Sequence, residues 1–303
     1  MVVGYSPARP ASTSARVRQT VELLQRRGYA LTPQRLAALC LGGELSEDEV
    51  RWAVAASAEL TIAEGLVVER SALARVGEIS ARAGSHNIDA APYLPMTARF
   101  VRTLVAVAPF IKSVSVAGSL ASGGFRATDD VDLNLIVDDG HRHLAYVAVN
   151  ALGIAHALAH RAKPVDDLTR RPLAPRLMTA NLILESSQCH PLARQDADMA
   201  YELLVAEPVF GFETLSGILG SNPELFDHFP QLADKRPRMH VDRPAWHVPA
   251  ALYPTSFDGA ARRLGEAAWR YMQWTRRHHP EALARVAYVR DTMRPYTLFD
   301  GGR

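Results

Sequence analysis

The sequence has little of what marks secreted, membrane-spanning or strongly nucleic-acid-binding proteins. It holds 2 cysteines in 303 residues, and Cys40 and Cys189 are too far apart to suggest a zinc motif. The formal net charge is only +2, so a global positive field for nucleic acid is missing. No apolar run approaches membrane-spanning length, and MVVGYSPARPASTSAR lacks the apolar centre of a signal peptide. We therefore expect a protein of the reducing cytoplasm without a membrane partner.

What is present is an ordinary globular composition, with 48% hydrophobic and 22% charged residues. A chain of this length can form two or three units with cores of their own. Stretches rich in proline, glycine and polar residues divide the chain into four predicted parts: a disordered lead-in (1–15), a winged-helix-like domain (16–92), an α/β core (93–195) and a helical C-terminal domain (196–303).

The predicted N-terminal domain has three short helices followed by a small hairpin, the order of a winged helix. Thr32-Pro33 is an N-cap with proline in the first helical turn, and Ser46 with Glu49 forms a capping box. The stretch ELTIAEGLVVERS reads as two strands around Glu64-Gly65. We expect this hairpin to pack its apolar side chains against the α/β core: Leu60, Ile62, Leu66 and Val68.

The most informative stretch is VSVAGSLASGGFRATDDVDLNLIV, residues 114 to 137. It predicts two strands joined by a loop of small residues. Successive strand residues alternate faces, so Asp130, Asp132 and Asn134 share one face. Two neighbouring carboxylates repel each other unless a cation compensates them, and Mg²⁺ prefers such hard oxygen ligands. The pair therefore predicts a magnesium site.

The turn after the first strand suits a phosphate group. Gly118 lets backbone amides approach closely, and Ser119 adds a hydroxyl donor. Residues 120 to 129 form a connection long enough to bring the aspartates back beside this turn. Arg126, within the connection, is a candidate contact for a terminal phosphate.

Strand, Gly-Ser, a loop of about ten residues and an Asp-x-Asp strand together resemble the DNA polymerase β-like nucleotidyltransferase superfamily. The resemblance implies that Gly118 and Ser119 hold a nucleoside triphosphate such as ATP, and that Asp130 and Asp132 are catalytic residues holding two Mg²⁺ ions. It implies an α+β fold with a central small mixed β-sheet, flanked by a winged-helix-like segment and a helical C-terminal region. A looser likeness extends to a strand with Asn181 and a helix containing Ala200-Tyr201-Glu202-Leu203.

The sequence departs from this pattern at the third carboxylate, which the superfamily usually supplies from a neighbouring strand. The run LMTANLILES predicts Asn181, Ile183 and Glu185 on one face. Asn181 stands where the acid is expected, so we predict it as a cofactor-binding residue and Glu185 as the third catalytic acid. The alternative is a site that works with two acids. Weaker candidates are a metal pair, His156 and His160, and a basic patch: Arg170, Arg171 and Arg176.

These features predict a Mg²⁺-dependent transferase that moves an NMP from an NTP to a hydroxyl or similar group of a small-molecule acceptor. RNA, tRNA or a protein remains an alternative acceptor. A further alternative is a winged-helix DNA-binding regulator whose core senses nucleotides. The third helix, SEDEVRWAVAAS, argues against DNA binding because it carries three acids and one arginine.

Overall fold

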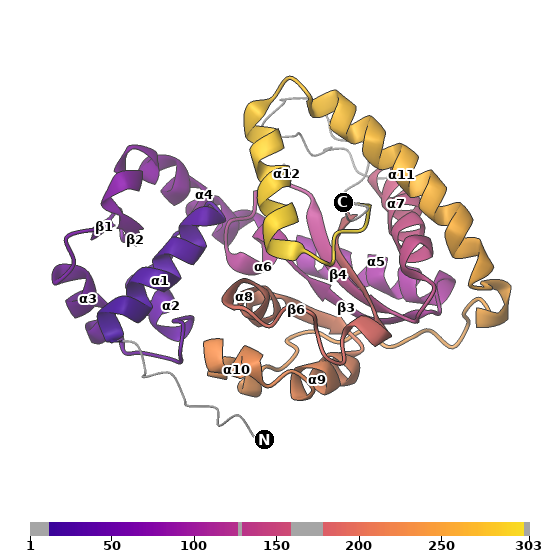
Figure 1. Ribbon diagram of the computed structural model, residues 1–303, viewed down its shortest axis with the longest axis horizontal. Helices are drawn as coiled ribbons and strands as arrows, with labels where there is room; N and C mark the ends of the chain where they lie inside the picture. The colour runs from indigo at the N-terminus through magenta and orange to yellow at the C-terminus, as the bar shows by residue number, and fades with distance from the viewer. Residues whose placement is uncertain (1–11, 127–128, 159–177, 300–303) are drawn as a thin grey trace, which may run out of the picture.

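The computed structural model describes residues 12–126, 129–158 and 178–299 (Figure 1). The fold is α+β, with a mixed sheet of four strands and a separate two-stranded sheet in the described part of the chain. The N-terminal helices and hairpin lie at one end of the molecule, and the mixed sheet lies in the larger part (Figure 1). The predicted α+β class and the small mixed sheet are confirmed.

The N-terminal part contains α1 (Thr13–Arg26), α2 (Pro33–Ala38) and α3 (Glu47–Ala55), then strands β1 (Leu60–Ala63) and β2 (Leu66–Glu69). Its local signals act as expected. The Thr32 hydroxyl accepts a hydrogen bond from the Arg35 amide, and Ser46 and Glu49 form both bonds of a capping box. Glu64 and Gly65 turn the antiparallel hairpin with φ of 50° and 77°.

The hairpin does not pack as the sequence suggested. Leu60, Leu66 and Val68 are buried, but β1 and β2 pack on α1, α2 and α3 within the N-terminal part. Ile62 is 36% exposed. Both faces of β2 are buried: Val67 joins the cluster of the three helices, while Leu66 and Val68 pack with Ala30, Val76 and Ile79. The hairpin therefore has little apolar surface left to face the core.

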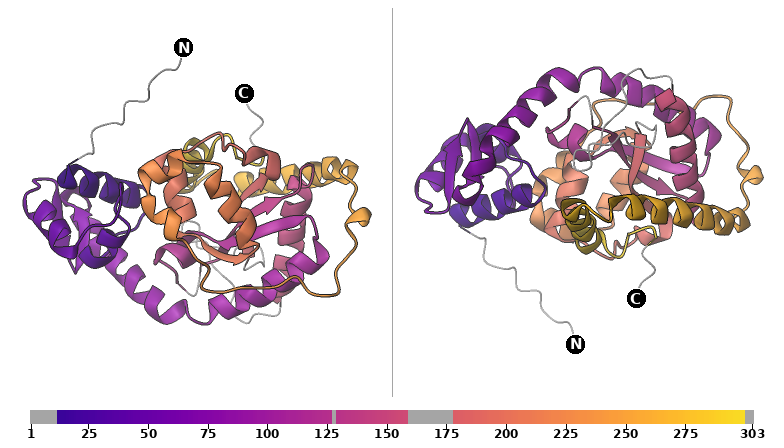
Figure 2. Two further views of the ribbon diagram at one scale, coloured as in Figure 1. Left: turned by 90° about the horizontal axis from the view of Figure 1, so that it is seen from below. Right: turned by 90° about the horizontal axis from the view of Figure 1, so that it is seen from above.

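Two helices lead from this part into the larger one. After a 3₁₀ segment (Arg70–Arg75) come α4 (Val76–Asp89) and α5 (Tyr93–Val107), which run from one part to the other in both views of Figure 2. None of the α4 side chains is buried, whereas α5 buries Phe100, Val101 and Leu104 against the sheet. Thus α4 is a connecting helix and α5 belongs to the core.

The mixed sheet has the strand order β5-β4-β3-β6. Strand β3 (Ile111–Val116) is antiparallel to both β4 (Val131–Val137) and β6 (Glu207–Phe210), while β5 (Met178–Glu185) is parallel to β4. A short helix, α6 (Gly118–Ser122), follows β3. The sequence predicted β3, β4 and β5 but not β6, which is a four-residue strand drawn from beyond residue 195.

The two faces of the sheet are covered by different helices. Val131, Leu133 and Leu135 belong to an apolar cluster with α5 and α7 (Arg142–Leu158). Ile136 and Leu184 belong to a second cluster with α8 (Ala197–Val205), α9 (Phe212–Gly220) and the N-terminal helices. This second cluster joins the N-terminal part to the sheet.

The C-terminal helices enclose the sheet from the outside. After α10 (Glu224–His228), two 3₁₀ segments (Pro230–Asp234 and Ala250–Leu252) lead to α11 (Ser256–Arg276) and α12 (Pro280–Met293). Helix α11 packs along α7, and α12 turns back to reach α8 (Figure 1). The sequence predicted these helices at nearly the same positions.

Among the described residues, the helices are all too short or too polar to cross a membrane.

Candidate functional site

The Gly-Ser turn and the Asp-x-Asp strand meet as the sequence predicts. Gly118 has φ of +59°, and a Cβ placed on it would overlap the carboxylate of Asp132. The Ala117 amide donates to the Asp132 carbonyl at 2.8 Å, so the turn and the start of β4 are joined by backbone as well. Only glycine allows this approach, because any side chain would displace the carboxylate.

Both aspartates lie at the start of β4, an inner strand of the sheet, and are partly exposed. Asp132 accepts a hydrogen bond on Oδ1 from the Thr179 hydroxyl of β5 at 2.9 Å. Its other oxygen, Oδ2, is the one nearest Gly118. Asp130 precedes β4 by one residue and lies on the same face by strand alternation. Hard carboxylate oxygens beside a glycine turn are a donor set that fits Mg²⁺.

The loop after the turn is held by the connecting helix α4. Arg126 donates from its amide and its guanidinium to Asp129 at 3.2 and 3.3 Å, and Arg82 of α4 reaches the same carboxylate at 3.3 Å. The Phe125 amide donates to Nδ1 of His86 at 3.2 Å. Burial, together with the nearby Arg35, lowers the pKa of His86. A neutral His86 is the form that accepts this bond, which ties α4 to the loop that follows α6.

Below the aspartates, the polar face of the sheet continues into a buried network. Asn134 Nδ2 and Asn181 Nδ2 each donate to Oε1 of Glu202 at 3.0 Å, and Asn181 Nδ2 also donates to Asn134 Oδ1 at 2.8 Å. Glu202 projects from α8 and is only 4% exposed. A carboxylate can only accept, so the amide atom of Asn181 facing it is the nitrogen. The carbonyl oxygen of Asn181 is left out of this network.

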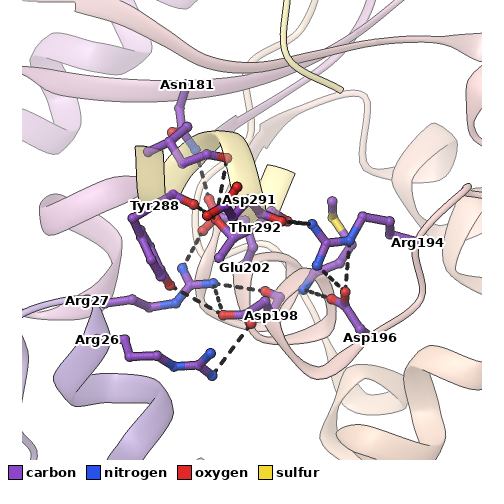
Figure 3. Close-up of polar contacts among 12 residues, drawn as sticks. Arg26, Arg27, Asn181, Arg194, Asp196, Asp198, Glu202, Tyr288, Asp291 and Thr292 are labelled. Atoms are coloured by element: carbon purple, nitrogen blue, oxygen red, sulfur yellow. Dashed lines mark hydrogen bonds and ion pairs between the residues drawn. The ribbon is translucent and has the colours of Figure 1, made fainter. Parts of the chain in front are cut away.

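The charge of Glu202 is balanced by an arginine from the N-terminal part. Arg27, at the end of α1, donates to Glu202 Oε2 at 3.0 Å and to the backbone and carboxylate oxygens of Asp198 (Figure 3). Its guanidinium also lies 5.2 Å from the Tyr201 ring centre. Burial alone would lower the pKa of Arg27, but Glu202, Tyr288 and Asp198 together outweigh burial and raise it. Tyr288 of α12 reaches Asp198 at 3.4 Å, so three parts of the chain meet here.

Glu185 is not brought to the aspartates. It pairs with Val137, which follows Asp132 by about 16 Å along β4 at the usual rise. The register between β4 and β5 shifts after Leu133, where Asn181 is the extra residue. This bulge turns Ile183 and Glu185 onto the face opposite Asn134. Glu185 Oε1 accepts from the Gly140 amide at 2.9 Å, which is the role of a loop anchor.

The remaining sequence candidates are placed as follows. Ser119 lies in the turn and is buried. His156 packs edge-on against Phe100 at 5.7 Å. His160 and the patch of Arg170, Arg171 and Arg176 lie outside the described residues. Within the described part of the chain, His, Cys, Asp and Glu side chains do not gather in groups of three or more that could hold a metal.

Sequence reasoning missed the roles of Arg27, Glu202 and Thr179. Glu202 lies among the apolar residues of α8, and Arg27 continues the apolar spacing of Leu23 and Leu24. A charge on an apolar helical stripe signals a buried pair. The two residues are 175 positions apart, so sequence alone does not pair them.

Comparison with protein-family models, with characterised proteins and with solved structures gave no match for this chain.

The close approach at Gly118 gives a first prediction. We expect Gly118→Ala to lower the free energy of unfolding by about 1–3 kcal/mol, because a left-handed conformation is strained for alanine and Cβ meets Asp132. Gly84→Ala in α4 is the matched control, since its added Cβ meets nothing within 4 Å. Urea denaturation of both variants measures the difference. Equal stability of the two would contradict the tight turn.

Proposed function

We propose that the protein is a Mg²⁺-dependent nucleotidyltransferase that transfers an NMP from an NTP to an acceptor hydroxyl. The observation that carries the proposal is the contact between the Gly118 turn and the Asp132 carboxylate. A phosphate-binding turn and a pair of metal-binding acids are useful together only when a phosphate and a cation share the site. A solvent-facing pair of aspartates would not require glycine at this position.

In this proposal each residue has a defined task. Ser119 and the backbone of the turn bind the triphosphate, while Asp130 and Asp132 would hold the Mg²⁺. Bound Mg²⁺ would neutralise charge on the phosphates and favour departure of pyrophosphate. The acceptor oxygen forms a bond to the α-phosphorus as the bond to the pyrophosphate oxygen breaks, and the proton of the acceptor hydroxyl passes to water. Thr179 fixes the Asp132 carboxylate, because its hydroxyl donates to Oδ1.

The third position of the site is occupied by a neutral amide in this proposal. Asn181 is fixed by Glu202 and Asn134 through its nitrogen, so its carbonyl oxygen is the atom that these bonds do not use and that we assign to the nucleotide. Glu202 itself is engaged with Arg27 and is buried. The site therefore works with two ionised acids, which is the second of the two alternatives that the sequence left open.

Glu185→Gln distinguishes these alternatives. We expect this variant to keep wild-type nucleotide transfer, because Glu185 lies on the opposite face of the sheet. A catalytic acid would lose roughly 10²–10⁴-fold in turnover on the same change. Steady-state rates at saturating NTP and Mg²⁺ measure the effect. A loss of that size would show that Glu185 is the third catalytic acid.

A small-molecule acceptor is the substrate class that the overall charge favours. Helix α3 begins with Glu47, Asp48 and Glu49, so this helix would repel a DNA backbone. The regulator alternative is therefore not supported by the N-terminal part.

The proposal is tested by incubating the full chain with each NTP labelled at the α-phosphate, Mg²⁺ and a metabolite extract. We expect label to appear in a new product in proportion to enzyme, and to require Mg²⁺. Release of labelled NMP would show that water is the acceptor, and transfer to added RNA would show that RNA is the acceptor. If no NTP were consumed with any fraction of the extract, the proposal would be contradicted.

A further inference from the structure

Helix α11 carries an exposed apolar stripe that the proposed function does not use. Phe257, Leu264, Tyr271 and Trp274 are between 53% and 66% exposed. Scattered exposed apolar residues are common, but a contiguous row of large ones marks an interaction surface.

The spacing of the stripe is that of a helix-packing seam. Phe257, Leu264 and Tyr271 follow one another at seven-residue intervals. Ala260, Ala267 and Trp274 lie three residues after each of them, and both alanines are exposed. This is the a and d pattern of a heptad repeat, which places all six residues on one side of the helix. The residues that pack inward, Ala261 and Gly265, lie on another side, against α7 and the chain's own tail.

A row of arginines borders the same stripe. Arg263, Arg270 and Arg277 are exposed and also repeat every seven residues, each one position before the seam or its continuation. Arg270 approaches Glu266 at 3.7 Å, and Arg277 lies over the Trp274 ring at 4.1 Å. The other acid of the helix, Asp258, is turned inward and binds His143. The border of the stripe is therefore strongly positive, although the whole chain is nearly neutral.

We infer that this surface of α11 binds an amphipathic helix of a partner protein, with an apolar seam and acidic residues along one flank. The heptad spacing selects a helix, and the arginine row selects its negative charge.

Two other occupants fit less well. A second copy of α11 packed antiparallel would oppose the arginine row to itself, which is unfavourable. Nucleic acid bases need open aromatic faces, whereas Tyr271 and Trp274 stack on each other with centroids 6.2 Å apart, and Arg277 covers Trp274. Phe257, Leu264 and the alanines would also contribute nothing to phosphate binding.

The test uses two synthetic helical peptides of the same length as α11, with leucine at the a and d positions. One carries glutamate at the e and g positions, and the other carries lysine. Fluorescence anisotropy with the full-length protein is expected to show the glutamate peptide binding at least about tenfold tighter than the lysine peptide. The double variant Leu264→Ala/Tyr271→Ala should weaken that binding about tenfold or more.

Charge reversal makes the test specific. In Arg263→Glu/Arg270→Glu/Arg277→Glu, we expect the preference to switch to the lysine peptide. Trp52→Ala, which removes an equally exposed aromatic side chain from α3, is the control and should bind like wild type. Circular dichroism verifies that each variant is folded.

The inference would be overturned if the glutamate peptide did not bind, or if both peptides bound equally. It would also be overturned if single-stranded oligouridylate or phosphatidylserine vesicles bound more tightly through the same residues. A dimer in solution that Leu264→Ala dissociates would likewise contradict it. The inference does not rest on the proposed transferase activity, because none of the varied residues belongs to the candidate site.

Discussion

Asp132→Asn is expected to reduce nucleotide transfer by about 10³-fold or more, because one of the two ionised metal ligands is lost. The fold should be retained. Asparagine keeps an oxygen that can accept from the Thr179 hydroxyl, and the backbone bond from Ala117 does not involve the side chain. Rates measured over a Mg²⁺ titration, with thermal unfolding in parallel, separate loss of chemistry from loss of structure.

The matched control lies at the other end of the same strand. Asp138 follows β4, is 42% exposed in its side chain and pairs with Lys112 at 3.2 Å. Asp138→Asn removes the same charge from the chain and should leave the rate unchanged. Similar rates in Asp132→Asn and wild type would show that the carboxylate beside the Gly118 turn has no catalytic role.

The second large effect is expected from Arg27→Met, which should lower the free energy of unfolding by about 3–5 kcal/mol. The change leaves the Glu202 charge buried without its partner, at a site that also holds Asn134 and Asn181. Adding Glu202→Gln to Arg27→Met should recover part of the loss, because the uncompensated charge is then absent. Denaturant unfolding of the single and double variants measures the loss of stability and its partial recovery.

The neighbouring arginine is the control for this prediction. Arg26 pairs with the same Asp198, but at 3.6 Å and with 53% of its side chain exposed. Exposed ion pairs contribute little to stability, so Arg26→Met should lower the free energy of unfolding by no more than about 1 kcal/mol. Equal losses for Arg26→Met and Arg27→Met would contradict a buried junction between α1 and the sheet.

The parts of the site that the sequence predicts are local ones. Gly118, Ser119, Asp130 and Asp132 lie within one strand-turn-strand segment, and strand alternation is enough to place both acids on one face. Because the two strands pair with each other directly, these residues are brought together by contacts that are close in sequence. The N-caps at Thr32 and Ser46 were predictable for the same reason.

The parts that escaped prediction depend on long-range pairing. The side of β5 on which Glu185 lies depends on a bulge at Asn181, and one extra residue reverses every later side chain. The partner of Glu202 comes from α1, far away in sequence. Likewise β6 is too short to be recognised by alternation and exists because β3 offers it an edge.

The central claim is that the Gly118 turn and the two aspartates form one Mg²⁺–nucleotide site. Calorimetric titration of the full chain with a non-hydrolysable NTP, with and without Mg²⁺, tests it most directly because no acceptor has to be known. We predict binding that requires Mg²⁺, is lost in Asp132→Asn and is unchanged in Glu185→Gln. NTP binding that does not depend on Mg²⁺ would contradict the claim. So would binding that is retained in Asp132→Asn but lost in Glu185→Gln.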